Sequence, residues 1–319
     1  MDNSSRIQHF PISFFAIVMG LAGLTIAWEK AQHVLQLGFN MSGALTLIVS
    51  LVFVLILAMY LTKLVTFRDE VIKELNHPVK LNFFAAISIS LILLSVVFLN
   101  ISHELALMLW MVGSVLQLVF TLYVMNAWIH HEHYQIQHSN PAWFIPVVGN
   151  VLVPISGTGL GYFEISWFFF SIGMVFWLVL LTIIMNRVFF HNPLPAKLMP
   201  TFFILIAPPA VGFVAYVKLT GDIDAFARVL YYIGLFLTLL LLTQLRRFVK
   251  IQFFLSWWAY SFPLAAITIA TLVMYSSNGI PAFAALSWVL LSLVSLVVVM
   301  LLYKTAKAIS IKGICLPED

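Results

Sequence analysis

Four histidines and a glutamate gather near the middle of the sequence: His130, His131, Glu132, His133 and His138. Imidazole is the commonest metal-binding side chain, so this cluster could hold a transition metal. The same residues also suit a polar loop after an apolar segment, and no second cluster completes a site. We therefore expect no bound metal and no cofactor. With no convincing nucleophile or acid–base pair elsewhere, we also expect that the protein is not an enzyme.

A second pattern joins aromatic pairs to residues that break helices. Five residues after the second aromatic stands a glycine or a proline, in four copies: Phe14-Phe15 with Gly20, Trp143-Phe144 with Gly149, Phe202-Phe203 with Pro208, and Trp257-Trp258 with Pro263. A fifth pair, Phe83-Phe84, has Ile89 at that position. Proline removes a backbone hydrogen bond and kinks a helix. The pattern predicts similar helices that share a hinge at Gly20, Gly149, Pro208 and Pro263.

The composition indicates that these helices cross a membrane. The chain is 62% hydrophobic and only 9% charged, with a mean hydropathy of +1.05, so it lacks the charged surface of a soluble domain. A bilayer core takes about 20 apolar residues per helix. We predict one transmembrane domain over 1–319, without a soluble domain, and ten spans near 10–28, 41–65, 81–99, 105–128, 141–162, 165–187, 198–217, 223–245, 251–275 and 281–303.

The spans divide into two kinds. The odd-numbered spans collect proline, glycine and serine, whereas the even-numbered spans are plain runs of leucine, valine, isoleucine and phenylalanine. Broken backbone in a membrane is tolerated only where protein or a water-filled cavity covers it. The predicted fold is an all-α polytopic membrane protein. Its five helical hairpins place five kinked odd-numbered helices in an inner ring around a central pore.

The register of the repeat predicts the residues that line this pore. The positions before the breaker and three residues to either side are mostly small and apolar. Those we assign to the lining are Ala16, Met19, Gly23, Ala85, Ser88, Val148, Ala207, Ala259 and Ala266. Phe262 is the one large aromatic in the same register. It either projects into the narrowest part and plugs it, or packs between neighbouring helices as an ordinary core residue.

The lysines and arginines predict the orientation in the membrane. Thirteen of them fall at the N-terminus, after even-numbered spans or in the C-terminal tail: Arg6, Lys63, Arg68, Lys73, Lys80, Arg187, Lys197, Arg246, Arg247, Lys250, Lys304, Lys307 and Lys312. The opposite side has Lys30, Lys218 and Arg228. Both termini are therefore expected in the cytoplasm. This asymmetry explains the pI of about 9.1 without nucleic acid as a partner.

Several short motifs resemble one known family. Phe10-Pro11, the stretch 19–23, Pro208-Pro209 and Phe262-Pro263 are similar to the TehA-type tellurite-resistance/dicarboxylate transporter family, to which plant guard-cell slow anion channels also belong. The resemblance covers approximately residues 10–305. It implies a homotrimer in a bacterial inner membrane, with a pore in each protomer that conducts small anions. It also implies that a phenylalanine of the ninth span, here Phe262, occludes that pore.

No acidic, basic or histidine residue lies well inside any odd-numbered span. Ionisable groups within a membrane usually mark proton relays and ion coupling, so their absence favours passive conduction. Selectivity would then depend on pore width, hydroxyl groups and dehydration cost, and nitrate would pass more readily than chloride. Membrane lipid and small inorganic anions are the expected partners. The alternative is a secondary transporter for C4-dicarboxylate or tellurite, which would show saturable, ion-coupled flux.

Overall fold

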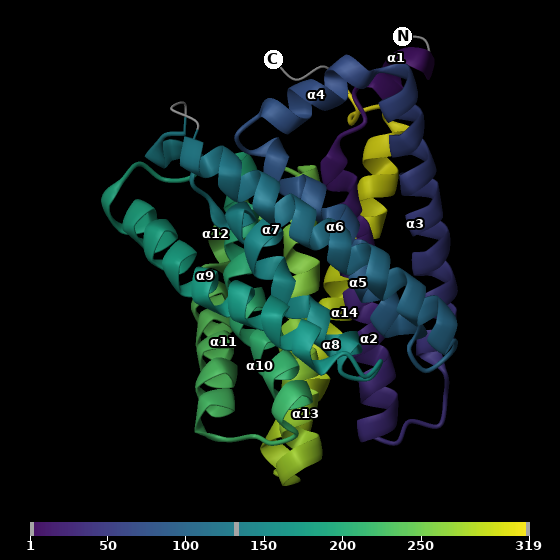
Figure 1. The fold of residues 1–319 in the computed structure, drawn as a ribbon, viewed down its shortest axis with the longest axis vertical. Helices are drawn as coiled ribbons and strands as arrows, with labels where there is room; N and C mark the ends of the chain where they lie inside the picture. Colours follow the sequence, from purple (N-terminus) through teal and green to yellow (C-terminus); the bar gives the residue numbers. More distant parts are fainter. Residues whose placement is uncertain (1–2, 131–133, 317–319) are drawn as a thin grey trace.

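The computed structural model describes residues 3–130 and 134–316, and every regular element in these ranges is helical. Nine helical stretches within them are long and apolar enough to cross a membrane. The prediction of an all-α polytopic membrane protein is therefore confirmed. The two ends of the chain lie at the same end of the molecule (Figure 1).

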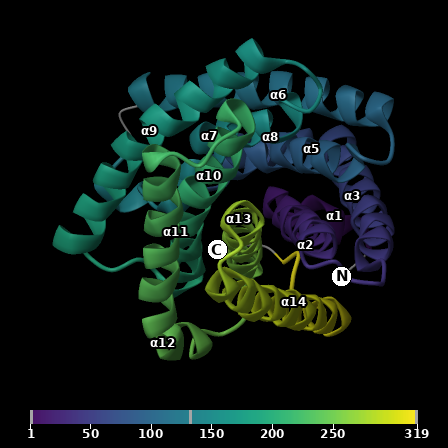
Figure 2. The ribbon, with the colours of Figure 1, turned by 90° about the horizontal axis from the view of Figure 1, so that it is seen from below.

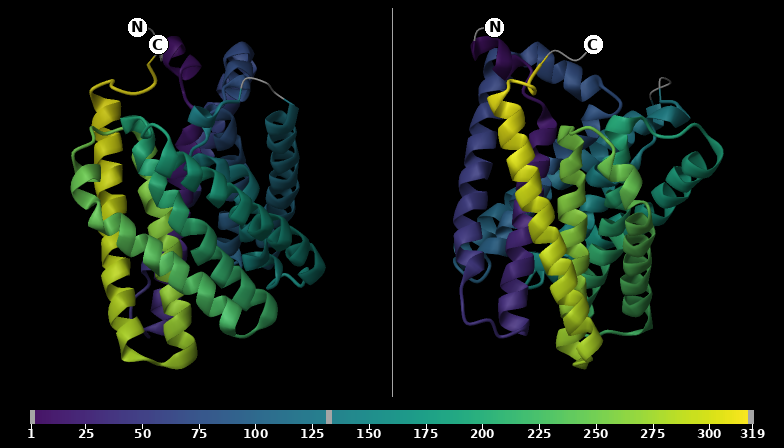
Figure 3. Two further views of the ribbon diagram at one scale, coloured as in Figure 1. Left: turned by 90° about the vertical axis from the view of Figure 1, so that its left-hand side faces the viewer. Right: turned by 180° about the vertical axis from the view of Figure 1, so that it is seen from behind.

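The chain runs as five hairpins, each with an inner and an outer member (Figures 1 and 3). The outer members are the continuous helices α3 (Met41–Thr66), α6 (His103–His130), α9 (Phe163–Phe190), α11 (Ala225–Thr243) and α14 (Pro281–Ser310). Short helices precede the first hairpin or connect one hairpin to the next: α1 (Asn3–Gln8), α4 (Arg68–Asn76), η3 (Ile136–His138) and α12 (Leu245–Val249). Outer helices bury only a minority of their residues, as expected of lipid-facing helices.

The inner members are composite. They comprise η1 (Ile12–Phe14) with α2 (Phe15–Val34), η2 (Lys80–Phe84) with α5 (Ala85–Phe98), η4 (Pro141–Trp143) with α7 (Phe144–Val148), η5 (Gly149–Leu152) and α8 (Val153–Gly157), η6 (Ala196–Ile206) with α10 (Ala207–Thr220), and η7 (Leu255–Tyr260) with α13 (Ser261–Asn278). Each inner member contacts the next one, and α13 closes the ring against α2. Figure 2 shows this ring with the outer helices around it.

Each inner member opens as a 3₁₀-helix and then becomes an α-helix. The aromatic pairs of the sequence mark this change: Phe14 ends η1 and Phe15 begins α2, while Phe84 ends η2. Pro208 is the second residue of α10 and Pro263 the third of α13. The first N–H groups of an α-helix have no partner within the helix, so proline costs little there. The prolines therefore begin the α-helical parts and do not kink them.

Two predicted breaks differ from this arrangement. The helix α2 runs without interruption through Gly20, because a single glycine weakens a helix but removes no hydrogen bond. The predicted span 141–162 is a succession of short 3₁₀ and α segments over Pro141–Gly157 and is the least regular of the inner members. Pro146 and Pro154, with Gly149 between them, explain its fragmentation, since proline has no N–H to donate.

Candidate functional site

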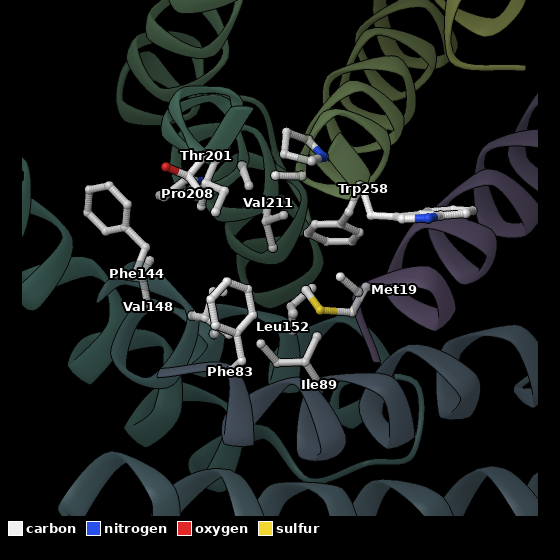
Figure 4. A pocket seen from close by; sticks show the side chains of 18 of the residues that line it. Met19, Phe83, Ile89, Phe144, Val148, Leu152, Thr201, Pro208, Val211 and Trp258 are labelled. Carbon is white, nitrogen blue, oxygen red and sulfur yellow. The ribbon is translucent and has the colours of Figure 1, made fainter. Parts of the chain in front are cut away.

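The ring of inner members encloses a cavity of about 80 Å³. All five inner members border it, mostly with apolar side chains that converge from different helices (Figure 4). The lining includes Ala16 and Met19 of α2, Phe83 of η2, Phe144 and Val148 of α7, Thr201 of η6, Pro208 of α10, and Trp258, Ala259 and Phe262 of η7 and α13. This cavity lies towards the end of the molecule that carries both termini. We call it the inner cavity.

A second cavity, of about 30 Å³, lies further along the same helices. On α13 the inner cavity touches Phe262 and Pro263, whereas the second touches Phe262, Ala266 and Ile269. We call this second space the outer cavity. The two cavities share three residues, Leu152, Val211 and Phe262. Of these Phe262 has the largest side chain, and it is 8% exposed.

The helix α2 approaches Phe262 closely through a glycine. A Cβ atom on Gly23 would lie 3.1 Å from Cδ2 of Phe262 and 3.0 Å from Cβ of Ala265. A methyl group on Gly20 would overlap the Ser261 side chain. Both glycines therefore allow α2 to pack closely on α13 near Phe262, although neither borders a cavity itself.

The predicted lining residues divide into two groups. Six border a cavity: Ala16, Met19, Val148, Ala207 and Ala259 the inner one, and Ala266 the outer one. Gly23, Ala85 and Ser88 border neither. Among the predicted hinge positions, Gly149, Pro208 and Pro263 border the inner cavity. Sequence reasoning missed Phe83, Phe144 and Trp258, each of which belongs to an aromatic pair, so the pairs themselves were the available signal.

The helix α5 turns Ile89 to the inner cavity and Ser88 away from it. The Ser88 hydroxyl lies 2.8 Å from the carbonyl oxygen of Ala85 and 2.6 Å from Oε1 of Gln117 on α6. The amide of Gln117 donates in turn to the carbonyl oxygen of Pro146, at 2.8 Å. Buried polar groups need such partners in an apolar surrounding. Ser88 thus belongs to a polar contact between α5, α6 and the fragmented inner member.

This polar contact continues along the fragmented member. The Thr121 hydroxyl of α6 lies 2.7 Å from the carbonyl oxygen of Pro146 and accepts a hydrogen bond of 2.9 Å from Nδ2 of Asn150. Because the 3₁₀ and α segments alternate here, their backbone groups lack a regular helical pattern. Side chains of the outer helix α6 therefore satisfy backbone of the inner member. The result is a fixed wall beside the inner cavity.

An ion pair joins the outer layer to the start of the first inner member. Lys63, at the end of α3, is 2% exposed, and its ammonium lies 3.1 Å from Oε2 of Glu74 on α4. The same ammonium donates to the carbonyl oxygen of Phe10, at 2.9 Å, and the hydroxyl of Tyr60 donates to Glu74, also at 2.9 Å. Buried charges require such compensation. The network fixes α4 and the residue before Pro11 at the end of the molecule that carries the termini.

The described residues contain no cluster of three or more metal-binding side chains. Of the predicted histidine cluster, His131, Glu132 and His133 lie outside the described residues. His130 ends α6, and one ring nitrogen of His138 accepts a hydrogen bond from the backbone of Gln135.

Comparison with known proteins agrees with this architecture. The family model of SLAC1, the voltage-dependent anion channel, matches residues 9–306. The S-type anion channel SLAH3 of Arabidopsis thaliana is 31% identical over 273 residues, which cover 83% of this chain and 43% of the plant protein. The guard cell S-type anion channel SLAC1 of the same plant is 25% identical, with 93% and 55% covered.

A bacterial relative matches over nearly its whole length. The tellurite resistance protein TehA homolog of Haemophilus influenzae is 27% identical over 309 residues, which cover 96% of this chain and 94% of the relative. The chain spans about half the length of the plant channels SLAH3 and SLAH2. The family model, in contrast, takes in all five hairpins. The chain therefore belongs to the family of SLAC1-type anion channels and TehA proteins.

Proposed function

We propose that this protein is a passive channel for small inorganic anions and that the side chain of Phe262 closes its pore. One observation carries the proposal: Phe262 borders both the inner and the outer cavity, which follow one another along the axis of the five inner members. A bulky apolar side chain between two cavities is a barrier to a hydrated ion. Membership of an anion-channel family supports the nature of the permeating ion.

The chemistry of the cavities favours passive flow. No ionisable side chain is among the described residues that border either cavity. A carrier coupled to protons or cations needs such groups near its substrate site, so a C4-dicarboxylate or tellurite transporter is less well supported. An apolar lining also restores little of the hydration energy that an ion loses. Weakly hydrated anions such as nitrate should therefore pass more readily than chloride.

We further propose that both termini face the cytoplasm of a bacterium, that the protein lies in the inner membrane, and that it assembles as a homotrimer. Two observations support this orientation. Both termini lie at the same end of the molecule, and basic residues occur near the ends of the outer helices, such as Lys63, Arg187 and Lys304. The inner cavity then opens towards the cytoplasm. The pore lies within one protomer, because all five inner members of a single chain border both cavities.

The test is electrical recording in planar bilayers, with chloride and nitrate gradients. We expect Phe262→Ala to raise the anion current at least tenfold, because a barrier lowered by about 1.4 kcal/mol already increases a rate tenfold. The matched control is Phe236→Ala on the outer helix α11, where the side chain is 62% exposed. Equal small currents from the wild type and a well-folded Phe262→Ala protein would exclude Phe262 as the barrier.

A further inference from the structure

Among the described residues, only four side chains that border the inner cavity carry a hydrogen that could bind an anion. They are Ser13, Thr201, Ser256 and Trp258; the rest of the lining is apolar. An anion needs hydrogen-bond donors, and the lone pairs of an oxygen repel it. Each hydroxyl has one O–H to donate, and the indole ring has one N–H. The number of side-chain donors available to an anion therefore depends on which of these four hydrogens point into the cavity.

Three of the four hydrogens are already used. The hydroxyl of Thr201 donates to the carbonyl oxygen of Leu198, at 2.6 Å. The hydroxyl of Ser256 donates to the carbonyl oxygen of Lys197, also at 2.6 Å. The indole N–H of Trp258 points away from the ring of inner members and donates to the hydroxyl of Thr305 on α14, at 3.0 Å. The hydroxyls of Thr201 and Ser256 can therefore present only lone pairs to the cavity.

Ser13 differs from the other three. It is the middle residue of η1, and its side chain is half-buried at the beginning of the first inner member. Its hydroxyl has no hydrogen-bond partner among residues 3–130 and 134–316, so its hydrogen is free to turn into the cavity. Ala16 and Met19 continue the same wall from Ser13 towards the level of Phe262.

We propose that the Ser13 hydroxyl is the side-chain donor that contacts a small inorganic anion in the inner cavity and sets the preference among anions. This assignment rests on the proposed function, since it places the ion in the inner cavity. Chloride is more strongly hydrated than nitrate and gains more from a replacement hydrogen bond. Loss of the Ser13 hydroxyl therefore lowers the permeability of chloride more than that of nitrate.

The experiment measures the permeability ratio of nitrate to chloride from reversal potentials, in the Phe262→Ala background that gives a measurable current. Ser13→Ala is expected to raise this ratio about three- to tenfold, the effect of losing part of a hydrogen bond to a charged partner. Ser13→Thr keeps a hydroxyl at the same position and should keep the ratio of its parent. Ser256→Ala and Thr201→Val alter the same wall without removing a free donor, so each should change the ratio less.

The outcomes separate the two proposals. A raised ratio in Ser13→Ala that Ser13→Thr restores supports the assignment. An anion current whose ratio changes equally in Ser13→Ala and Ser256→Ala would overturn the role of Ser13 and leave the channel intact. The absence of any anion current from folded Phe262→Ala protein would reject the channel and, with it, the anion contact at Ser13. Size-exclusion profiles in detergent check that each variant is folded.

Discussion

The inner and outer members of the hairpins have similarly apolar sequences, but they differ in burial and in helix type. Four inner spans bury between 72% and 83% of their most apolar stretch, whereas the five outer spans bury between 22% and 39%. The inner members all open as 3₁₀-helices, and the outer members are continuous α-helices. A 3₁₀-helix has poorer hydrogen-bond geometry, and lipid offers nothing to compensate it. Irregular backbone is thus found where other helices cover it.

The outer helices also support the inner ones. Side chains of α3 and α6 reach inwards to backbone carbonyl oxygens at Phe10 and Pro146. If the inner ring depends on these contacts, substitutions that remove them should destabilise the protein far more than similar substitutions on the lipid-facing side. Substitutions at Lys63, Gly149 and Thr121, each paired with a matched control, test this dependence.

The largest expected effect is at Lys63. Lys63→Met removes the ammonium and leaves the Glu74 carboxylate buried beside Tyr60, so we expect a loss of about 3–5 kcal/mol. The matched control is Lys73→Met on α4. Lys73 pairs with Glu70 at 2.6 Å, but its side chain is 71% exposed, and such surface pairs contribute little to stability.

Thermal unfolding in detergent measures both variants. The double variant Lys63→Met with Glu74→Gln should recover part of the lost stability, because it no longer leaves a charge without a partner. Equal melting temperatures for Lys63→Met and Lys73→Met would show that the network between α3, α4 and Phe10 does not hold the inner ring.

An intermediate effect is expected at Gly149. A Cβ atom there would lie 2.7 Å from Cδ1 of Ile89 and 2.9 Å from Nε2 of Gln117, so Gly149→Ala should cost about 1–3 kcal/mol through overpacking. The control is Gly234→Ala on the outer helix α11, where the nearest atoms are 3.4 Å away. Alanine also favours a helix over glycine by about 1 kcal/mol, so this control should be neutral or stabilising. A lower melting temperature for Gly234→Ala than for Gly149→Ala would contradict the comparison.

The sequence predicted the layers of this fold well, because lipid imposes strong rules on composition and length. The spacing of aromatic pairs also placed several lining residues, since the inner members share one register. Val148, Ala207 and Phe262 lie at equivalent positions of three inner members, and each borders the inner cavity.

The finer features depend on how neighbouring helices are rotated, which one sequence does not reveal. Ser88 was assigned to the lining, but a hydrogen bond to Gln117 turns it towards α6 and brings Ile89 to the cavity. Gly20 was assigned as a hinge, but it serves the close packing of α2 on Ser261. In both cases the partner lies on another helix. The free hydroxyl of Ser13 was missed for the same reason, because only the structure shows which hydroxyls are already bonded.

The smallest expected effect is at Thr121, which compares two threonines of outer helices. The Thr121 hydroxyl faces the carbonyl oxygen of Pro146 and accepts from Asn150, whereas the Thr182 hydroxyl donates to Leu178 of its own helix on an exposed face. Thr121→Val keeps the shape of the side chain and should cost about 1–2 kcal/mol, since it deprives buried inner groups of a partner. Thr182→Val should change stability by at most about 0.5 kcal/mol. Equal melting temperatures for the two variants would mean that the fragmented inner member holds its shape through its own backbone and apolar packing, and that α6 is no more than its covering layer.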